Sequence, residues 1–154
     1  MTATAAFALV TSALAALEGI DAEVYDGPVL SQAEPASYVI IGGQGWADDD
    51  DPTPWTTDAE WRSVPIGAGS REENVTIPCE VTAWSGSGEW AALRSEASAL
   101  FDDVAGVLLT REAWDDCPVN IGPLTFTNVQ VTQELLDPGM AVRITFDIDA
   151  RAYL

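Results

Sequence analysis

Residues 73–109, "ENVTIPCEVTAWSGSGEWAALRSEASALFDDVAGVLL", hold a strand pattern followed directly by a helix pattern. From residue 75 to residue 83 apolar and polar side chains alternate, which is the period of a strand with one buried face. Pro78 has no N–H for a sheet hydrogen bond, so its side of the strand is expected to face a sheet edge or a bulge. A short Ser-Gly-Ser-Gly segment then separates this strand from the predicted helix.

The second half of this stretch predicts the best-defined helix of the chain. Its apolar residues recur at helical spacing, while Arg94 and Asp103 fall on the opposite, solvated face. Ser85 or Ser87 is the expected N-cap, and Glu89 falls in the first turn, where the helix dipole favours an acid. We interpret the apolar face as core rather than as a cofactor or membrane surface. It comprises Trp90, Leu93, Ala97, Leu100, Phe101, Val104, Val107 and Leu108.

A second, alanine-rich helix is predicted near the N-terminus. Thr2 or Thr4 is the expected cap and Gly19 the expected end. No Lys or Arg precedes the apolar run, so a signal peptide is not expected. The residues at i, i+3, i+7 and i+10 that predict its buried face are Phe7, Val10, Leu14 and Leu17.

Short strands are predicted at residues 22–25 and 38–41, joined by a loop or an irregular hairpin, and another at residues 62–67. The C-terminal region predicts a longer hairpin closed by a Pro-Gly turn. In its first strand the alternation changes phase near Thr127, which indicates a bulge. In its last strand, apolar residues alternate with polar ones from residue 142 onwards.

These elements predict an α+β fold for a single domain spanning residues 1–154. We expect a mostly antiparallel sheet with two helices packed on one face, a long acidic loop at residues 42–60 and a C-terminal β-hairpin.

The charge is strongly one-sided, with 25 acidic residues against six arginines and a net charge of −19. This balance disfavours nucleic-acid binding and anionic membranes. The chain has no histidine, which excludes histidine-based triads and metal sites. Among so many acids, no carboxylate pair points to catalysis, so neither an enzyme activity nor a cofactor is expected. Cys79 and Cys117 lack metal-ligand spacing, and we expect buried or half-buried thiols in a reducing compartment, with one disulfide as the lesser alternative.

The acidic loop carries two tryptophans, Trp46 and Trp55, and Trp61 follows it. Tryptophan is enriched in interface cores, so we predict that this segment is an assembly arm. The alternative is that the rings fold back onto the sheet. The acidic run between them is contiguous and ends in proline, unlike a calcium-binding loop, and is interpreted as a solvated surface. It consists of Asp48, Asp49, Asp50 and Asp51.

The order of these elements, from the N-terminal helix through residues 73–109 to the closing "AVRITFDIDARAYL", resembles the tail terminator proteins of long-tailed bacteriophages. The resemblance implies a virion protein of the tail or neck, assembled in the host cytoplasm and without a catalytic site. It implies a homo-oligomeric ring, typically a hexamer, that caps the tail tube and ends its polymerisation. The expected partners are the tail tube protein and head-tail connector proteins, with DNA passing through the lumen without specific binding.

The few arginines are expected to contribute to assembly. We predict that several of Arg94, Arg111, Arg143 and Arg151 pair with acids across subunit boundaries, with Arg143 and Arg151 as the residues to test. Two other functions stay open. One is another neck or tail component, such as a head-tail connector or a tube subunit. The other is an acidic inhibitor that mimics DNA.

Overall fold

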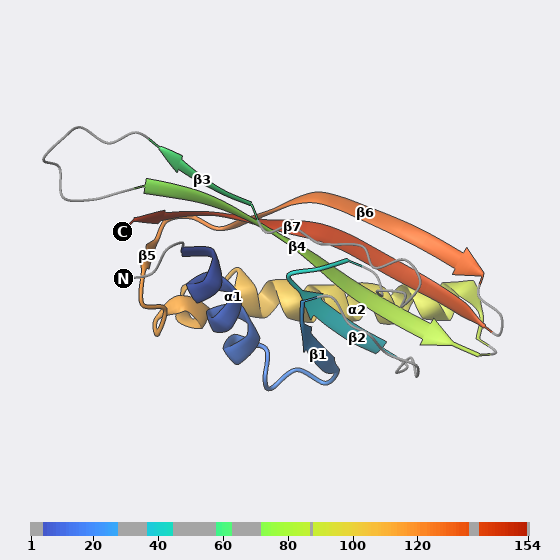
Figure 1. Ribbon diagram of the computed structural model, residues 1–154. Helices are drawn as coiled ribbons and strands as arrows, with labels where there is room; N and C mark the ends of the chain where they lie inside the picture. Colours follow the sequence, from blue (N-terminus) through green and yellow to red (C-terminus); the bar gives the residue numbers. More distant parts are fainter. Residues whose placement is uncertain are drawn as a thin grey trace, which may run out of the picture.

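Two strands of 14 residues, β4 (Glu72–Ser85) and β7 (Met140–Tyr153), form the centre of the sheet in the computed structural model (Figure 1). They pair antiparallel along their whole length. The structure describes residues 5–27, 37–44, 58–62, 72–86, 88–135 and 139–153, and for residues 58–62 it describes the backbone alone. Within these ranges the chain forms a seven-stranded, mostly antiparallel sheet and two α-helices, which confirms the predicted α+β fold class.

The alternation in the two central strands places the core on one face of the sheet. Apolar side chains are buried at odd positions of β4, from Val75 to Ala83, and at even positions of β7, from Val142 to Ala152. These rows belong to one core with residues of α1 (Ala5–Ala16) and α2 (Trp90–Leu108). Both helices lie on the same side of the sheet in Figure 1, as predicted. The opposite face carries the polar residues of the two strands.

Two short strands share the side of β4 that faces away from β7. β2 (Ser37–Ile41) pairs with the second half of β4, and β3 (Asp58–Arg62) pairs with the first half. Pro78 lies between these two pairings, and its carbonyl accepts a hydrogen bond of 2.8 Å from the N–H of Gly42. Since the nitrogen and the carbonyl of a strand residue point to the same side, the missing N–H of Pro78 faces this break. The expected edge or bulge is therefore a junction between two strands.

For the first two strands, the hairpin alternative is wrong, because β1 (Glu23–Asp26) runs parallel to β2, whereas a hairpin would join antiparallel strands. Of the strand predicted at residues 62–67, only Arg62 lies within the described residues, where it is the last residue of β3. Because β3 begins at Asp58, the acidic loop predicted at residues 42–60 is too long at its C-terminal end. Pairing with β4 supplies the hydrogen bonds that make this polar sequence a strand.

Helix α2 confirms the predicted core face. Its buried residues are all members of that face, with the remaining members partly buried against the core. The predicted cap at Ser85 is wrong, because the pairing of Ser85 with Met140 holds it in β4. Glu89 takes the N-cap position without a side-chain cap hydrogen bond, and Ser87 lies outside the described residues.

Helix α1 forms where expected but turns a different face to the sheet. Phe7 is 70% exposed, whereas Leu9 and Ala13 are buried. The predicted face is therefore wrong at Phe7. An alanine-rich helix is apolar on all sides, so its spacing does not define one face, and the smaller side chains allow a closer approach to the sheet.

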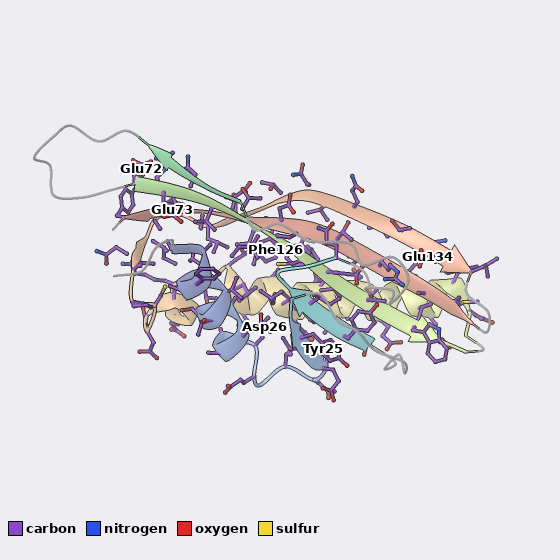
Figure 2. The ribbon with its side chains drawn as sticks, in the orientation of Figure 1. Tyr25, Asp26, Glu72, Glu73, Phe126 and Glu134 are labelled. Atoms are coloured by element: carbon purple, nitrogen blue, oxygen red, sulfur yellow. The ribbon has the colours of Figure 1, made fainter. Side chains whose placement is uncertain are left out.

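The start of α1 is held by an acid from the sheet. Glu73 of β4 is fully buried, and its Oε1 accepts a hydrogen bond of 2.9 Å from the N–H of Ala5. Figure 2 shows Glu73 on the strand above this helix. The carboxylate satisfies a backbone donor at the helix start and places negative charge at the positive end of the helix dipole. The predicted caps, Thr2 and Thr4, lie outside the described residues.

Two short elements connect α2 to the C-terminal hairpin. The 3-10 helix η1 (Arg111–Trp114) is fixed by a 2.8 Å hydrogen bond from Trp114 Nε1 to the carbonyl of Leu108. The two-residue strand β5 (Asn120–Ile121) pairs with the end of β7.

The hairpin strand β6 (Thr125–Leu135) contains the predicted bulge. Its register against β7 shifts between Thr127 and Gln130, and Asn128 adopts a positive φ of 53°. Before the bulge, Phe126 stacks on Phe146 of the core at a centroid distance of 4.7 Å. The bulge adds one residue to β6, so the strand keeps one apolar face although its alternation changes phase.

Replacing Glu73 is expected to detach the start of α1. We expect Glu73→Ala to lower the free energy of unfolding by about 3 kcal/mol, since a buried donor loses a charged acceptor. Glu73→Gln keeps an acceptor oxygen, and about half that loss is expected. The matched control is Glu72→Ala, with a loss of less than about 1 kcal/mol for a partly exposed ion pair. Urea unfolding measures all three, and equal losses for Glu72→Ala and Glu73→Ala would contradict this role.

The bulge requires a residue that tolerates the left-handed region. Asn128→Val is expected to lower the free energy of unfolding by about 2 kcal/mol, because a β-branched side chain is strained at this φ. Asn128→Gly should lose less than about 1 kcal/mol, since it keeps the backbone and removes only an exposed hydrogen bond. Thermal and urea unfolding compare the two variants. Similar losses would show that the side chain, rather than the backbone, matters at this position.

Candidate assembly surface

The face of the sheet opposite the helices carries a charge network centred on Arg143 of β7. Its Nε donates to Glu134 Oε2 of β6 at 2.8 Å, and its Nη1 lies 3.4 Å from Glu80 Oε1 of β4. The same Nη1 donates to the hydroxyl of Tyr38 in β2 at 3.4 Å. Arg143 therefore links four strands that are consecutive in the sheet.

The network is largely closed to solvent. The side chain of Glu80 is 2% exposed and that of Arg143 is 14% exposed. Burial lowers the pKa of the Arg143 guanidinium, but the nearby Glu80, Tyr38 and Glu134 more than offset this effect and raise the pKa above its usual value. Arg143 is therefore charged at every pH at which the protein is handled, and it compensates the buried carboxylate of Glu80.

A second group of acids on this face binds β4 and the bulge to β7. Asp149 accepts hydrogen bonds of 2.7 Å from the hydroxyls of Thr76 and Thr127, one at each carboxylate oxygen. Asp147 Oδ2 accepts a hydrogen bond of 2.8 Å from Asn128 Nδ2. These acids connect neighbouring strands through hydrogen bonds.

The structure describes some of the predicted contact residues, and the others lie outside the described ranges. Arg143 has acid partners within its own chain, and Arg151 Nε lies 2.9 Å from Glu72 Oε1. Pairing across subunits stays a prediction, for which Arg151 is the better placed because its side chain is 46% exposed. Trp61 belongs to β3, opposite Glu73. The predicted residues outside the described ranges are Trp46, Trp55, Asp48, Asp49, Asp50 and Asp51.

The edge strand β6 presents apolar side chains to solvent. Val129 is 49% exposed, Val131 is 62% exposed and Leu135 is 81% exposed. Among the described strands β6 pairs with β7 alone, so its other edge carries unpaired backbone groups. The sequence pattern predicts the hairpin, but the open edge depends on which strands the fold places beside it.

A second apolar surface lies where α1 meets η1. The exposed Phe7 lines a groove of about 560 Å³ together with Ala8, Ala15 and Ala113. Small side chains form most of its lining, which also includes Glu112 and Asp116. Sequence spacing missed this surface because it assigned Phe7 to the core.

Both cysteines are free thiols, as expected for small buried or half-buried residues. Cys79 is fully buried and Cys117 is half-buried. Burial raises the pKa of the Cys79 thiol to about 12, so this residue stays protonated and unreactive at neutral pH.

The part of the chain that the structure describes was compared with the requirements of a metal site and of a membrane-spanning helix. There, Asp, Glu and Cys side chains form no group of three that could hold a metal ion. Neither α-helix in these ranges is long and apolar enough to cross a membrane.

Comparison with known proteins shows the fold of the chain. No protein family matches the sequence, and no curated protein matches it. Among solved structures, the fold is similar to that of a chain in "Virion of native gene transfer agent (GTA) particle". The TM-score is 0.60 and the sequence identity is 13%, with 97% of this chain and 99% of that chain covered. The two chains therefore share one fold over nearly their full lengths.

Arg143 can be tested as a structural residue. Arg143→Met is expected to lower the free energy of unfolding by about 3–5 kcal/mol, because Glu80 is left buried without its cation. Arg151→Met, at an exposed pair, should cost less than about 1 kcal/mol.

The pH dependence of this effect follows from the pKa of Arg143. Since that pKa is raised on folding, the contribution is complete below the ordinary arginine pKa and is lost only at higher pH. The difference between wild type and Arg143→Met should thus be equal at pH 7 and pH 9 in urea unfolding. A difference that shrinks strongly at pH 9, or an equal loss in Arg151→Met, would contradict this assignment.

Proposed function

We propose that this protein is a virion structural protein of phage type. The observation that carries the proposal is the similarity in fold, over nearly the full length of both chains, to a chain of a gene transfer agent virion. Fold alone does not define function, so the proposal also rests on the surfaces of this chain. They include the exposed apolar side chains of β6 and the open edges of the described strands, which are suited to assembly with other proteins.

Within the virion, we infer the role of a tail terminator. The chain would form a hexameric ring that caps the tail tube, ends its polymerisation and joins it to the head connector. The order of helices and strands supports this role, since it follows the resemblance noted in the sequence. A closed ring needs two different contact surfaces on each subunit, and the sheet offers an edge on each side.

The charge is consistent with a ring through which DNA passes. Six copies, each with a net charge of −19, would carry −114. A lumen within such a ring repels the phosphate backbone, so DNA would slide without adhering.

The alternative function is that of another neck or tail component, such as a head-tail connector or a tube subunit. The same fold similarity supports it, because similarity to one chain of a virion does not distinguish one virion component from another. A DNA-mimicking inhibitor has less support. Such a protein would display its acids for a partner, whereas Asp147, Asp149 and Glu80 bond to neighbouring strands within this chain.

The first experiment is light scattering of the purified protein at low and high concentration, followed by negative-stain imaging. A ring of six 16.3 kDa subunits has a mass of about 98 kDa and should show a central hole. Addition to polymerising tube protein of the same particle should then shorten the tubes and place rings at their ends. Unchanged tube lengths without end binding would exclude the terminator role, and incorporation along the tube would instead support a tube subunit.

A further inference from the structure

Four strands of the described part of the sheet, β1, β3, β5 and β6, are paired on one side only, and their open edges differ in length and charge. The β6 edge is 11 residues long and includes one charged residue, Glu134. β1 is four residues long and has an exposed acid at each end, Glu23 and Asp26 (Asp26 is labelled in Figure 2). β3 is five residues long and includes two acids and one arginine, Arg62. The β6 edge is therefore the longest, and only the two-residue strand β5 (Asn120–Ile121) has a lower density of charge.

Open strands of soluble proteins are usually protected against pairing with other chains. Charged side chains, prolines and short length are the common devices. β1 has both short length and charge, whereas β6 contains no proline and exposes Val129, Val131 and Leu135. Its bulge lies at Asn128, which leaves the seven residues after it as a regular strand paired on one side.

The net charge indicates what can occupy this edge. Two copies of a chain with a charge of −19 repel each other, and most strongly where acids face acids. Repulsion is weaker beside a strand with few charges. The β6 edge is therefore the part of the sheet that a second copy can approach with the smallest electrostatic penalty. Glu134, its one acid, is already paired with Arg143 of the same chain.

The complementary edge lies on the other side of the same sheet. β3 pairs with β4, while β6 pairs with β7, so the two strands extend opposite sides of the central pair. Within the described residues the outer side of β3 is open. β3 contains Trp61 and Ala59.

We propose that the β6 edge of one copy pairs with the β3 edge of a second copy, so that the sheets join head to tail. This inference rests on the proposed ring and names the surfaces that close it. Pairing of two different edges is a heterologous contact, which generates a ring when the rotation closes. Backbone hydrogen bonds supply the pairing, and the exposed apolar side chains of β6 are buried beside it.

Two charge substitutions test the proposal by complementation. Val131→Glu damages the β6 edge and leaves β3 intact, whereas Trp61→Glu damages β3 and leaves β6 intact. Each variant alone should lose the oligomer and remain at 16.3 kDa in light scattering. An equimolar mixture still contains one intact pair of edges, so it should form a dimer of about 33 kDa, twice the subunit mass. If two β6 edges paired with each other instead, Trp61→Glu alone would already form this dimer, and adding Val131→Glu would not increase its amount.

The matched control is Phe7→Glu, at an apolar residue that is 70% exposed on α1, and it should keep the wild-type mass. Oligomers retained in Val131→Glu but lost in Phe7→Glu would overturn the proposal in favour of the groove beside η1. A mixture that stays monomeric, although both variants show the wild-type unfolding transition, would overturn it as well.

Hydrogen exchange of the wild-type protein gives a test that needs no variant. Residues 58–62 and 125–135 should both gain protection as the chain associates at high concentration or on tube ends. Protection confined to other segments, or a wild-type chain that stays monomeric in both conditions, would show that the proposal is wrong. Tube capping distinguishes the terminator role from the proposed β6–β3 interface. If an oligomer caps the tubes but β6 gains no protection, the terminator role is supported and the interface is wrong. If both edges gain protection but the tubes are not capped, the interface is supported and the terminator role is wrong.

Discussion

The antiparallel pairing of β4 with β7 is the interaction on which the other elements depend. These strands are far apart in the sequence, so their pairing costs the entropy of closing a long loop. The pairing creates one apolar face, which α1 and α2 cover, and one polar face, where Arg143 meets Glu80. It also determines the edges, since β2 and β3 can add only to β4, and β5 and β6 only to β7.

Elements with one buried face could be predicted from the sequence, because burial imposes a period. This holds for both central strands, for α2 and for the change of phase that indicates the bulge at Asn128. Where every side is apolar, as in α1, the period is lost, and the orientation of Phe7 depends on how closely small residues approach the sheet. The direction of β1 depends on the path of the connecting chain, for which the local sequence carries no signal.

The assembly surface was less predictable for a related reason. An arginine in a strand pattern is assigned to the exposed face, but burial of Arg143 follows from the register of three neighbouring strands. Likewise, Val131 alternates as a half-buried residue should, and its exposure of 62% arises because no described strand lies beyond β6. Both features are determined by long-range pairing, which periodicity within one segment does not contain.

The high negative charge and the neutral edge have a joint consequence for assembly. Repulsion between copies acts over roughly a Debye length, about 8 Å at physiological salt, and so opposes every contact in which acids meet. Under the proposed pairing, a strand with a single charged residue offers the contact at which this repulsion is weakest. The charge that would keep DNA from adhering to the proposed ring would therefore also restrict how its subunits join. Added salt should relax this restriction before it weakens the backbone pairing itself, because screening acts on exposed charges and only weakly on hydrogen bonds between strands.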